Sequence, residues 1–237
     1  MSPEKSSSLK KTGGKAAPEK AGENHPGETG YQTEHREEHY KEYEKGEQRM
    51  SLVYAFLADG LEEVECLAAA DVLVRAGIEV KFISVSEKKE VTGTHGFRIT
   101  ADACIGDADL SAPDCYLLPG GQPGTEHLAE CRALCDALLS AEKNGKRIAA
   151  ICAAPTVPGR LGLLRGKRCT CYPGAANEEK LLGAEYTGLG VVTDGYVTTA
   201  KSVGFALDFG LEVASLLAGQ AKADEVQDRM IYEKRIG

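Results

Sequence analysis

Residues 147–155 read Arg-Ile-Ala-Ala-Ile-Cys-Ala-Ala-Pro, and this stretch decides how the rest of the chain is interpreted. The apolar run that follows Lys146 and Arg147 is typical of a buried central strand. Pro155 has the fixed φ of a residue in the first turn of a helix. We therefore predict that Cys152 lies where strand becomes helix. This is the geometry of a nucleophile elbow, in which the side chain projects from the carboxyl edge of a sheet.

Two interpretations of Cys152 follow from this stretch alone. A thiol at the positive end of a helix dipole is favoured as the reactive thiolate. A cysteine that closes an apolar strand is also commonly a small core residue, because cysteine is among the most buried residue types. The remainder of the chain has to decide between them.

Composition changes sharply near Met50. Residues 1–50 contain very few aliphatic side chains and are rich in Lys, Glu, Ser, Gly and His, so we predict a disordered extension that cannot bury enough apolar surface to order itself. Within it, nine Lys and Arg oppose ten Glu, so −7 of the chain's net charge of −8 falls on the remaining residues. That charge argues against nucleic-acid and anionic-membrane partners. The extension has no apolar signal region, and we expect a cytoplasmic protein that does not span a membrane.

Residues 51–237 are predicted to form one α/β domain. A strand over 51–57, a helix over 62–77 and a strand over 78–85 open it with the pattern of a parallel sheet. Further strands are expected over 114–118, 168–172, 191–192 and 196–200, with a hairpin over 91–102 and helices over 126–144, 156–164, 203–218 and 222–231. The pattern predicts a doubly wound, mainly parallel sheet of about six strands, sandwiched by helices.

All eight cysteines lie in this domain, and their spacing favours no cofactor. Cys131 and Cys135 are spaced for one helix face, and Cys169 and Cys171 alternate as on a strand. Neither pair has the spacing of a structural zinc site, so we predict reduced thiols, no metal and no cofactor.

Chemistry is expected beyond the carboxyl ends of the strands, where sites form in open parallel sheets. Three loops meet there, at 59–65, at 119–124 and at Cys152. The N–H groups of Gly120 and Gly121, together with that of Ala153 after the cysteine, could form an oxyanion hole. The alternative is that Pro-Gly-Gly is merely a loop.

A histidine partner for Cys152 is not evident in the sequence. Three of the five histidines lie in residues 1–50, His127 is predicted to open a helix, and His95 lies in the hairpin. A carboxylate is the remaining candidate, since Glu62, Glu63 and Glu65 crowd the start of the first helix. A glutamate desolvated beside the cysteine would have a raised pKa and could share a proton with it. The alternative for each glutamate is that it only compensates the helix dipole, and we favour this interpretation for Glu62.

Taken together, three motifs resemble the ThiJ/PfpI superfamily, in the branch of the parkinsonism-associated protein deglycase. They are Gly-Leu-Glu-Glu-Val-Glu at 60–65, Leu-Pro-Gly-Gly at 118–121 and Ala-Ala-Ile-Cys-Ala-Ala-Pro at 149–155, in the family's order and spacing. The resemblance covers about residues 51–230. It implies a flavodoxin-like, class I glutamine amidotransferase-like fold and a homodimer, and it favours the reactive interpretation of Cys152.

The resemblance also implies site residues and activities. The family's nucleophile falls on Cys152, its protonated glutamate on Glu65, and its facing amides on Gly120 and Gly121. Family members are described as glyoxalases that turn methylglyoxal into lactate without glutathione, as protein deglycases, and as redox sensors or chaperones. A small carbonyl substrate is therefore expected. Proteases of the superfamily place histidine after the cysteine, so Ala153 argues against that class, and a thiamine-pathway role ranks last because no phosphate-binding loop supports it.

Three departures from the family pattern put substrate choice in question. Tyr172 precedes a proline where the human-type proteins have histidine. His95 stands where an arginine commonly approaches the site, and Ser-Val-Gly at 202–204 replaces a Gly-Pro-Gly turn. His95 and Tyr172 are therefore candidates for lining the pocket.

Overall fold

Strand β1 (Leu52–Leu57) is buried on both faces and organises the core of this computed structural model, which describes residues 49–233 apart from the side chain of Glu178. Along β1, Val53, Ala55 and Leu57 face one apolar cluster, while Tyr54 and Phe56 face the other. This alternation follows from the two-residue period of a strand that has helices on both faces. The predicted disorder of residues 1–50 concerns residues outside those described, except Arg49 and Met50.

The central sheet has seven strands in the order β10-β11-β7-β6-β1-β2-β5, and all neighbouring pairs are parallel except β10 with β11. The remaining members of the sheet are β2 (Glu79–Ser84), β5 (Ala103–Cys104), β6 (Cys115–Leu118), β7 (Arg147–Ile151), β10 (Val191–Asp194) and β11 (Val197–Ala200). Two small sheets lie outside it, formed by β3 (Glu90–Thr92) with β4 (Arg98–Thr100) and by β8 (Arg168–Cys169) with β9 (Glu185–Tyr186).

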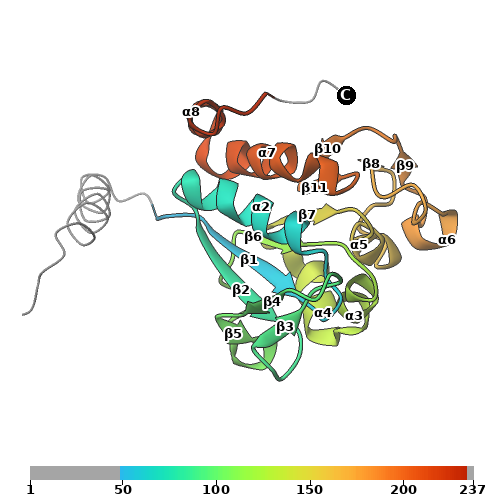
Figure 1. Cartoon of the computed structure of the whole chain (residues 1–237). Coiled ribbons are helices and arrows are strands. Elements are labelled where there is room, and N and C mark those ends of the chain that lie inside the picture. Colours follow the sequence, from blue (N-terminus) through green and yellow to red (C-terminus); the bar gives the residue numbers. More distant parts are fainter. Residues whose placement is uncertain (1–48, 234–237) are drawn as a thin grey trace, which may run out of the picture. The chain divides into compact units, whose positions relative to one another are not determined.

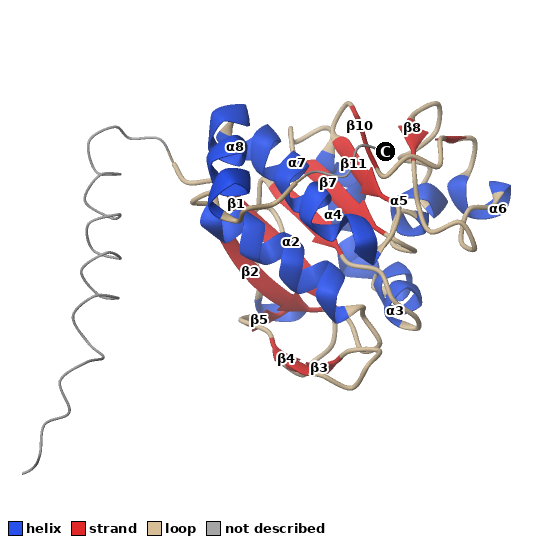
Figure 2. Cartoon of the chain, turned by 45° about the horizontal axis from the view of Figure 1, so that its top comes forward, coloured by secondary structure: helices blue, strands red, loops and turns tan. Residues whose placement is uncertain are grey.

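Helices cover both faces of the sheet, as Figures 1 and 2 show. One face packs against α2 (Glu63–Arg75), α7 (Ala206–Ala218) and α8 (Gln220–Arg229). The other packs against α3 (Gly124–Glu130), α4 (Arg132–Ala141) and α5 (Thr156–Arg160). The short elements are η1 (Ile105–Asp107), α6 (Glu178–Leu181) and η2 (Val203–Phe205). The described residues thus form the doubly wound, flavodoxin-like single domain that the sequence predicted.

Several predicted boundaries need correction. The helix expected over 126–144 is broken at Cys131, whose extended ψ of 97° separates α3 from α4. Cys131 and Cys135 therefore do not share one helix. The helix expected over 156–164 ends at Arg160, and the strand expected over 168–172 ends at Cys169, outside the central sheet.

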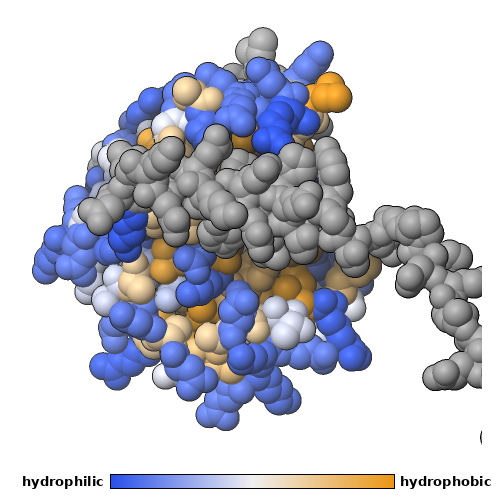
Figure 3. Space-filling model, turned by 90° about the vertical axis from the view of Figure 1, so that its left-hand side faces the viewer, coloured by the Kyte–Doolittle hydropathy of each residue, from blue (hydrophilic) through white to orange (hydrophobic). Residues whose placement is uncertain are grey.

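On the face shown in Figure 3, most of the coloured surface is hydrophilic, and apolar side chains gather in a smaller part of it. Among the exposed large apolar side chains are Val64, Leu67 and Val74, all on α2. Within residues 49–233, no helix combines the length and the hydropathy needed to cross a bilayer.

The topology fixes where a site can form. Strands β2 and β6 lie on opposite sides of β1, so the chain reverses its direction of winding there. The loops after β1, β6 and β7 consequently meet at the carboxyl edge of the sheet, where open α/β sheets bind ligands.

Candidate active site

Cys152 directly follows β7 and has a left-handed backbone, with φ of 63°. Its N–H donates to the Ala200 carbonyl at 2.8 Å, and its own carbonyl accepts from the Tyr172 N–H at 2.7 Å. A left-handed non-glycine residue costs on the order of 1–2 kcal/mol. Hydrogen bonds on both sides hold this conformation, so the backbone of the predicted elbow is present.

The helix after the elbow begins at the predicted residue, and a run of turns separates it from the thiol. Helix α5 begins at Thr156, and residues 152–155 form turns. Burial first, and then the nearby Glu65 carboxyl, raise the pKa of Cys152 to about 12, while the N–H groups of Ala153 and Gly121 act in the opposite direction. Burial beside the Glu65 carboxyl therefore opposes the thiolate that the sequence favoured.

Glu65 lies in the first turn of α2 and is fully buried. Its Oε2 accepts a hydrogen bond from the Gly120 N–H at 3.0 Å, and its own N–H is capped by Oε2 of Glu62 at 2.7 Å. Among the described residues, none donates to Oε1 with ordinary hydrogen-bond geometry. The Cys152 thiol and the Val203 N–H are nevertheless close enough to lower the pKa of this carboxyl group. Glu65 is thus fixed at one oxygen and faces the thiol.

The Glu65 carboxyl and the Cys152 thiol titrate as a coupled pair. Burial, and to a smaller extent the neighbouring Glu62 charge, raise the pKa of Glu65 to about 7, against hydrogen bonds from Cys152 and Gly120 that lower it. Because a negative charge on either group opposes ionisation of the other, the pair retains at least one proton at neutral pH.

Gly120 lets the two side chains approach each other. A Cβ added to it would lie 2.6 Å from Cys152 Cβ and 2.7 Å from Glu65 Oε2. Its N–H donates to Glu65, so Gly120 is not a free oxyanion donor as the sequence had suggested. The remaining candidate donors for an oxyanion are the N–H groups of Gly121 and Ala153, both of which lower the pKa of the Cys152 thiol.

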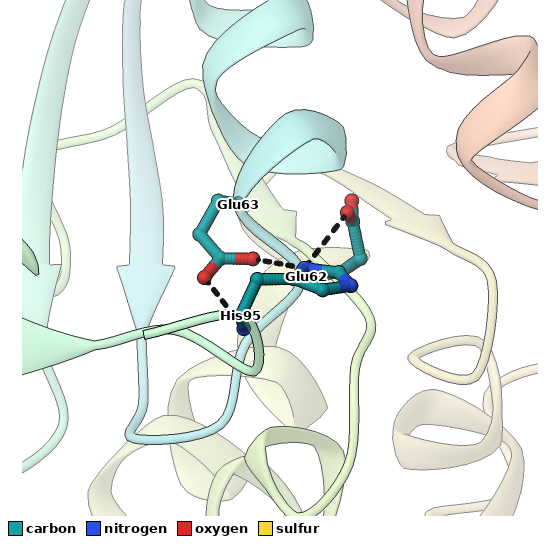
Figure 4. A group of neighbouring side chains, drawn as sticks. All are labelled: Glu62, Glu63 and His95. Atoms are coloured by element: carbon teal, nitrogen blue, oxygen red, sulfur yellow. Dashed lines mark hydrogen bonds and ion pairs between the residues drawn. The ribbon is translucent and has the colours of Figure 1, made fainter. Parts of the chain in front are cut away.

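Tyr172 and His95 occupy different places around this pair. Tyr172 adjoins it through its backbone, and its side chain is about half exposed. His95 instead binds the start of α2, where its Nδ1 lies 2.8 Å from Glu63 Oε2 and 3.8 Å from Glu62 Oε1 (Figure 4). This contact with Glu63 raises the pKa of the exposed His95 ring. The pKa of Glu63 is lowered overall, because its hydrogen bonds with His95 and with the backbone outweigh its burial.

Two contributions could not be found from the sequence. The backbone N–H of Val203 lowers the pKa of Glu65, and a backbone contact of this kind does not depend on the residue type at position 203. The sequence marks residues 202–204 only as a departure from the family turn. The carboxylates of Glu62 and Glu63 converge with His95 because the fold brings together residues more than thirty positions apart.

Comparison with known proteins places these features in context. A profile of the DJ-1/PfpI family matches residues 51–216. The glutathione-independent glyoxalase DJR-1.2 of Caenorhabditis elegans is 34% identical over 165 residues, which cover 70% of this chain and 87% of that protein. The crystal structure of Drosophila melanogaster DJ-1beta superposes with a TM-score of 0.73 at 34% identity, covering 78% of this chain and 100% of that one.

Some relatives are much longer than the matched region. Protein DJ-1 homolog A of Arabidopsis thaliana is 35% identical over 184 residues, which cover 76% of this chain but only 46% of the plant protein. The chain therefore spans about half the length of this relative.

Proposed function

Because the chain belongs to the DJ-1/PfpI family, we propose that it is a cysteine-dependent glyoxalase. It converts small 2-oxoaldehydes such as methylglyoxal into 2-hydroxy acids without glutathione, and the same chemistry on their protein adducts makes it a deglycase. The observation that carries the proposal is the packing of the Cys152 thiol and the buried Glu65 carboxyl on the same glycine, Gly120. The name of the C. elegans relative supports the reaction class.

The first step joins the substrate to the protein. As the Cys152 sulfur bonds to the aldehyde carbon, the thiol proton passes to the Glu65 carboxylate, since the raised pKa of the thiol calls for a base beside it. The electron pair of the C=O bond becomes an alkoxide, which the N–H groups of Gly121 and Ala153 stabilise. Glu65 then returns its proton to this oxygen, giving a neutral hemithioacetal.

The second step isomerises the hemithioacetal. Glu65 removes the hydrogen of the former aldehyde carbon as a proton, and the hydroxyl proton on that carbon passes to the ketone oxygen, by way of an enediol. Glu65 then delivers its proton to the adjacent carbon. The ketone becomes a secondary alcohol and the first carbon becomes a thioester of Cys152. Water cleaves the thioester and restores the thiol, so that methylglyoxal and water give lactic acid. General acid–base assistance of this kind contributes a factor of about 10² to 10⁴.

Lactate release from methylglyoxal tests the role of the thiol. Wild type should produce lactate, and Cys152→Ala should produce it no faster than buffer. The matched control is Cys135→Ala, which removes a half-buried thiol that donates to the Ala129 carbonyl on another element and should retain full activity. Equal rates in all three proteins would end the proposal.

A redox-sensor or chaperone role is the second candidate, because the same N–H groups can stabilise an oxidised sulfur. One peroxide molecule converts the thiol to a sulfenic acid and water, and a second gives the sulfinic acid. Cys152 should be oxidised before Cys104, Cys131 and Cys135, which are also only partly buried, because Glu65 can take the thiol proton as the sulfur attacks the peroxide. Peptide mass spectrometry after mild peroxide treatment should show that order, whereas uniform oxidation of these thiols would contradict it.

A homodimer is part of the proposal, with α2 as the contact helix. Val64, Leu67 and Val74 are 53%, 43% and 59% exposed and, together with Asp71, lie on one face of α2. Large apolar side chains aligned in this way favour a protein contact over solvent. Sedimentation equilibrium should show a dimer that Leu67→Asp weakens. Leu139→Asp, at a leucine of α4 with 46% exposure, should leave the dimer intact, and equal effects of the two changes would contradict the assignment.

A further inference from the structure

Three metal-ligating side chains converge beside the start of α2. Glu62 is the N-cap of the helix, Glu63 is its first residue, and His95 comes from the turn between β3 and β4 (Figure 4). One ligand atom from each residue can be chosen so that all three lie within 4.8 Å of one another. Neither the proposed reaction nor its thiol uses this group of atoms.

Each carboxylate divides its oxygens between a backbone N–H and the histidine ring. Oε2 of Glu62 accepts from the Glu65 N–H at 2.7 Å, and its Oε1 lies 3.8 Å from His95 Nδ1. Oε1 of Glu63 accepts from the His95 N–H at 2.8 Å, and its Oε2 lies 2.8 Å from the same ring nitrogen. Backbone N–H groups therefore orient both side chains. The second oxygen of each carboxylate lies near the same atom, His95 Nδ1. Anchoring of this kind is what positions ligands at metal sites.

The turn that carries His95 is itself held in place. The Gly60 N–H donates to the Thr92 carbonyl, and the Thr94 N–H donates to the Leu61 carbonyl, both at 2.8 Å. A side chain at Gly93 would collide with the Glu63 carboxyl, so the turn closes directly over it. Glu63 is only 3% exposed, whereas the ring of His95 remains open to solvent. The three side chains are thus already close together without an ion, and the His95 side of the group is accessible to solvent.

We propose that Glu62 Oε1, Glu63 Oε2 and His95 Nδ1 bind one divalent first-row transition-metal ion, such as Zn²⁺. Binding replaces the proton between His95 Nδ1 and Glu63 with the ion, and that proton leaves to solvent. One imidazole nitrogen with two carboxylate oxygens is a donor set that such ions accept, and water completes the coordination.

The present spacing is close to what the ion requires. Zinc binds nitrogen and oxygen at about 2.0–2.2 Å, which places neighbouring ligand atoms of a tetrahedral site roughly 3.4 Å apart. The two spacings to Nδ1, 2.8 and 3.8 Å, lie on either side of that value. Small shifts of the three side chains are therefore enough to admit the ion.

Nuclear magnetic resonance of the imidazole nitrogens tests the site directly. The full chain, labelled with ¹⁵N and kept reduced, is titrated with Zn²⁺. The Nδ1 signal of His95 should move to the position of a metal-bound nitrogen and saturate at one equivalent for this site. His127, an exposed histidine whose Nδ1 contacts the Asp59 carbonyl, is the internal control and should not move with it. An unchanged His95 signal, while zinc binds to thiols elsewhere, overturns the proposal.

Two variants sharpen the result. Glu63→Gln keeps the size of the side chain but removes its charge, and it should weaken zinc binding at His95 by about tenfold or more. His95→Arg places a permanent cation at the position and should abolish the site, whereas His127→Arg should leave it unchanged. If His95→Arg does not fold, the His95 signal of wild type and of Glu63→Gln still decides the matter. Equal affinity in wild type and Glu63→Gln refutes the assignment of ligands.

Discussion

Replacing Gly120 with alanine tests the contact on which the proposed chemistry depends. The new Cβ would lie 2.6 Å from Cys152 Cβ, 2.7 Å from Glu65 Oε2 and 2.9 Å from the Ile151 carbonyl oxygen. Ordinary carbon contacts are about 3.5–4.0 Å, so the thiol and the carboxyl must move apart by roughly 1 Å. Overpacking of this size costs about 1–3 kcal/mol of stability. A displacement of about 1 Å at reacting groups can cost a hundredfold in rate.

The assay measures lactate release from methylglyoxal, together with urea unfolding. Gly120→Ala should fold, lose about 1–3 kcal/mol of stability and lose about a hundredfold in rate at saturating substrate. Gly106→Ala in η1 is the matched control, because a Cβ there meets nothing within 4 Å, and both its rate and its stability should stay near wild type. If Gly120→Ala retains the rate of Gly106→Ala, the pair does not act through the contact described here.

Two further predictions concern stability. In urea unfolding, Cys152→Gly should have a free energy of unfolding about 1 kcal/mol higher than that of Cys152→Ala, because only glycine adopts φ of 63° without strain. Equal stabilities would show that the elbow is not strained. The pKa of Glu126 is lowered, first by its hydrogen bonds from Arg160, so its contribution to stability is present above the ordinary value of 4.5 and is lost as pH falls through the lowered pKa. The stability advantage of wild type over Glu126→Gln in urea should therefore shrink on acidification below pH 4.5, and an advantage that does not change with pH would contradict the ion pair.

The central sheet could be predicted because its signals are local. The apolar runs at Leu52–Leu57 and Arg147–Ile151 are strands whose side chains are buried on both faces, as their composition indicates. The break at Cys131 could not be predicted, because the apolar pattern continues across this extended residue. The short pairing of β8 with β9 is also set by contacts distant in sequence.

The candidate site was predictable as a set of residues but not in its roles. The motifs indicated Cys152, Glu65 and the glycine pair, and the structure brings all of them to one edge of the sheet. That the Gly120 N–H serves Glu65 rather than an oxyanion depends on the path of a loop. His95 was expected near the thiol, yet it pairs with Glu63, because the turn after β3 folds over the start of α2.

The rate of Glu65→Gln tests the central claim most directly, because glutamine keeps the shape of the side chain and its bond from the Gly120 N–H but cannot carry the proton. With Cys152 intact and the fold verified by urea unfolding, lactate formation from methylglyoxal should fall by about a hundredfold or more. A rate equal to that of wild type would contradict the assignment of Glu65 as the proton carrier of Cys152.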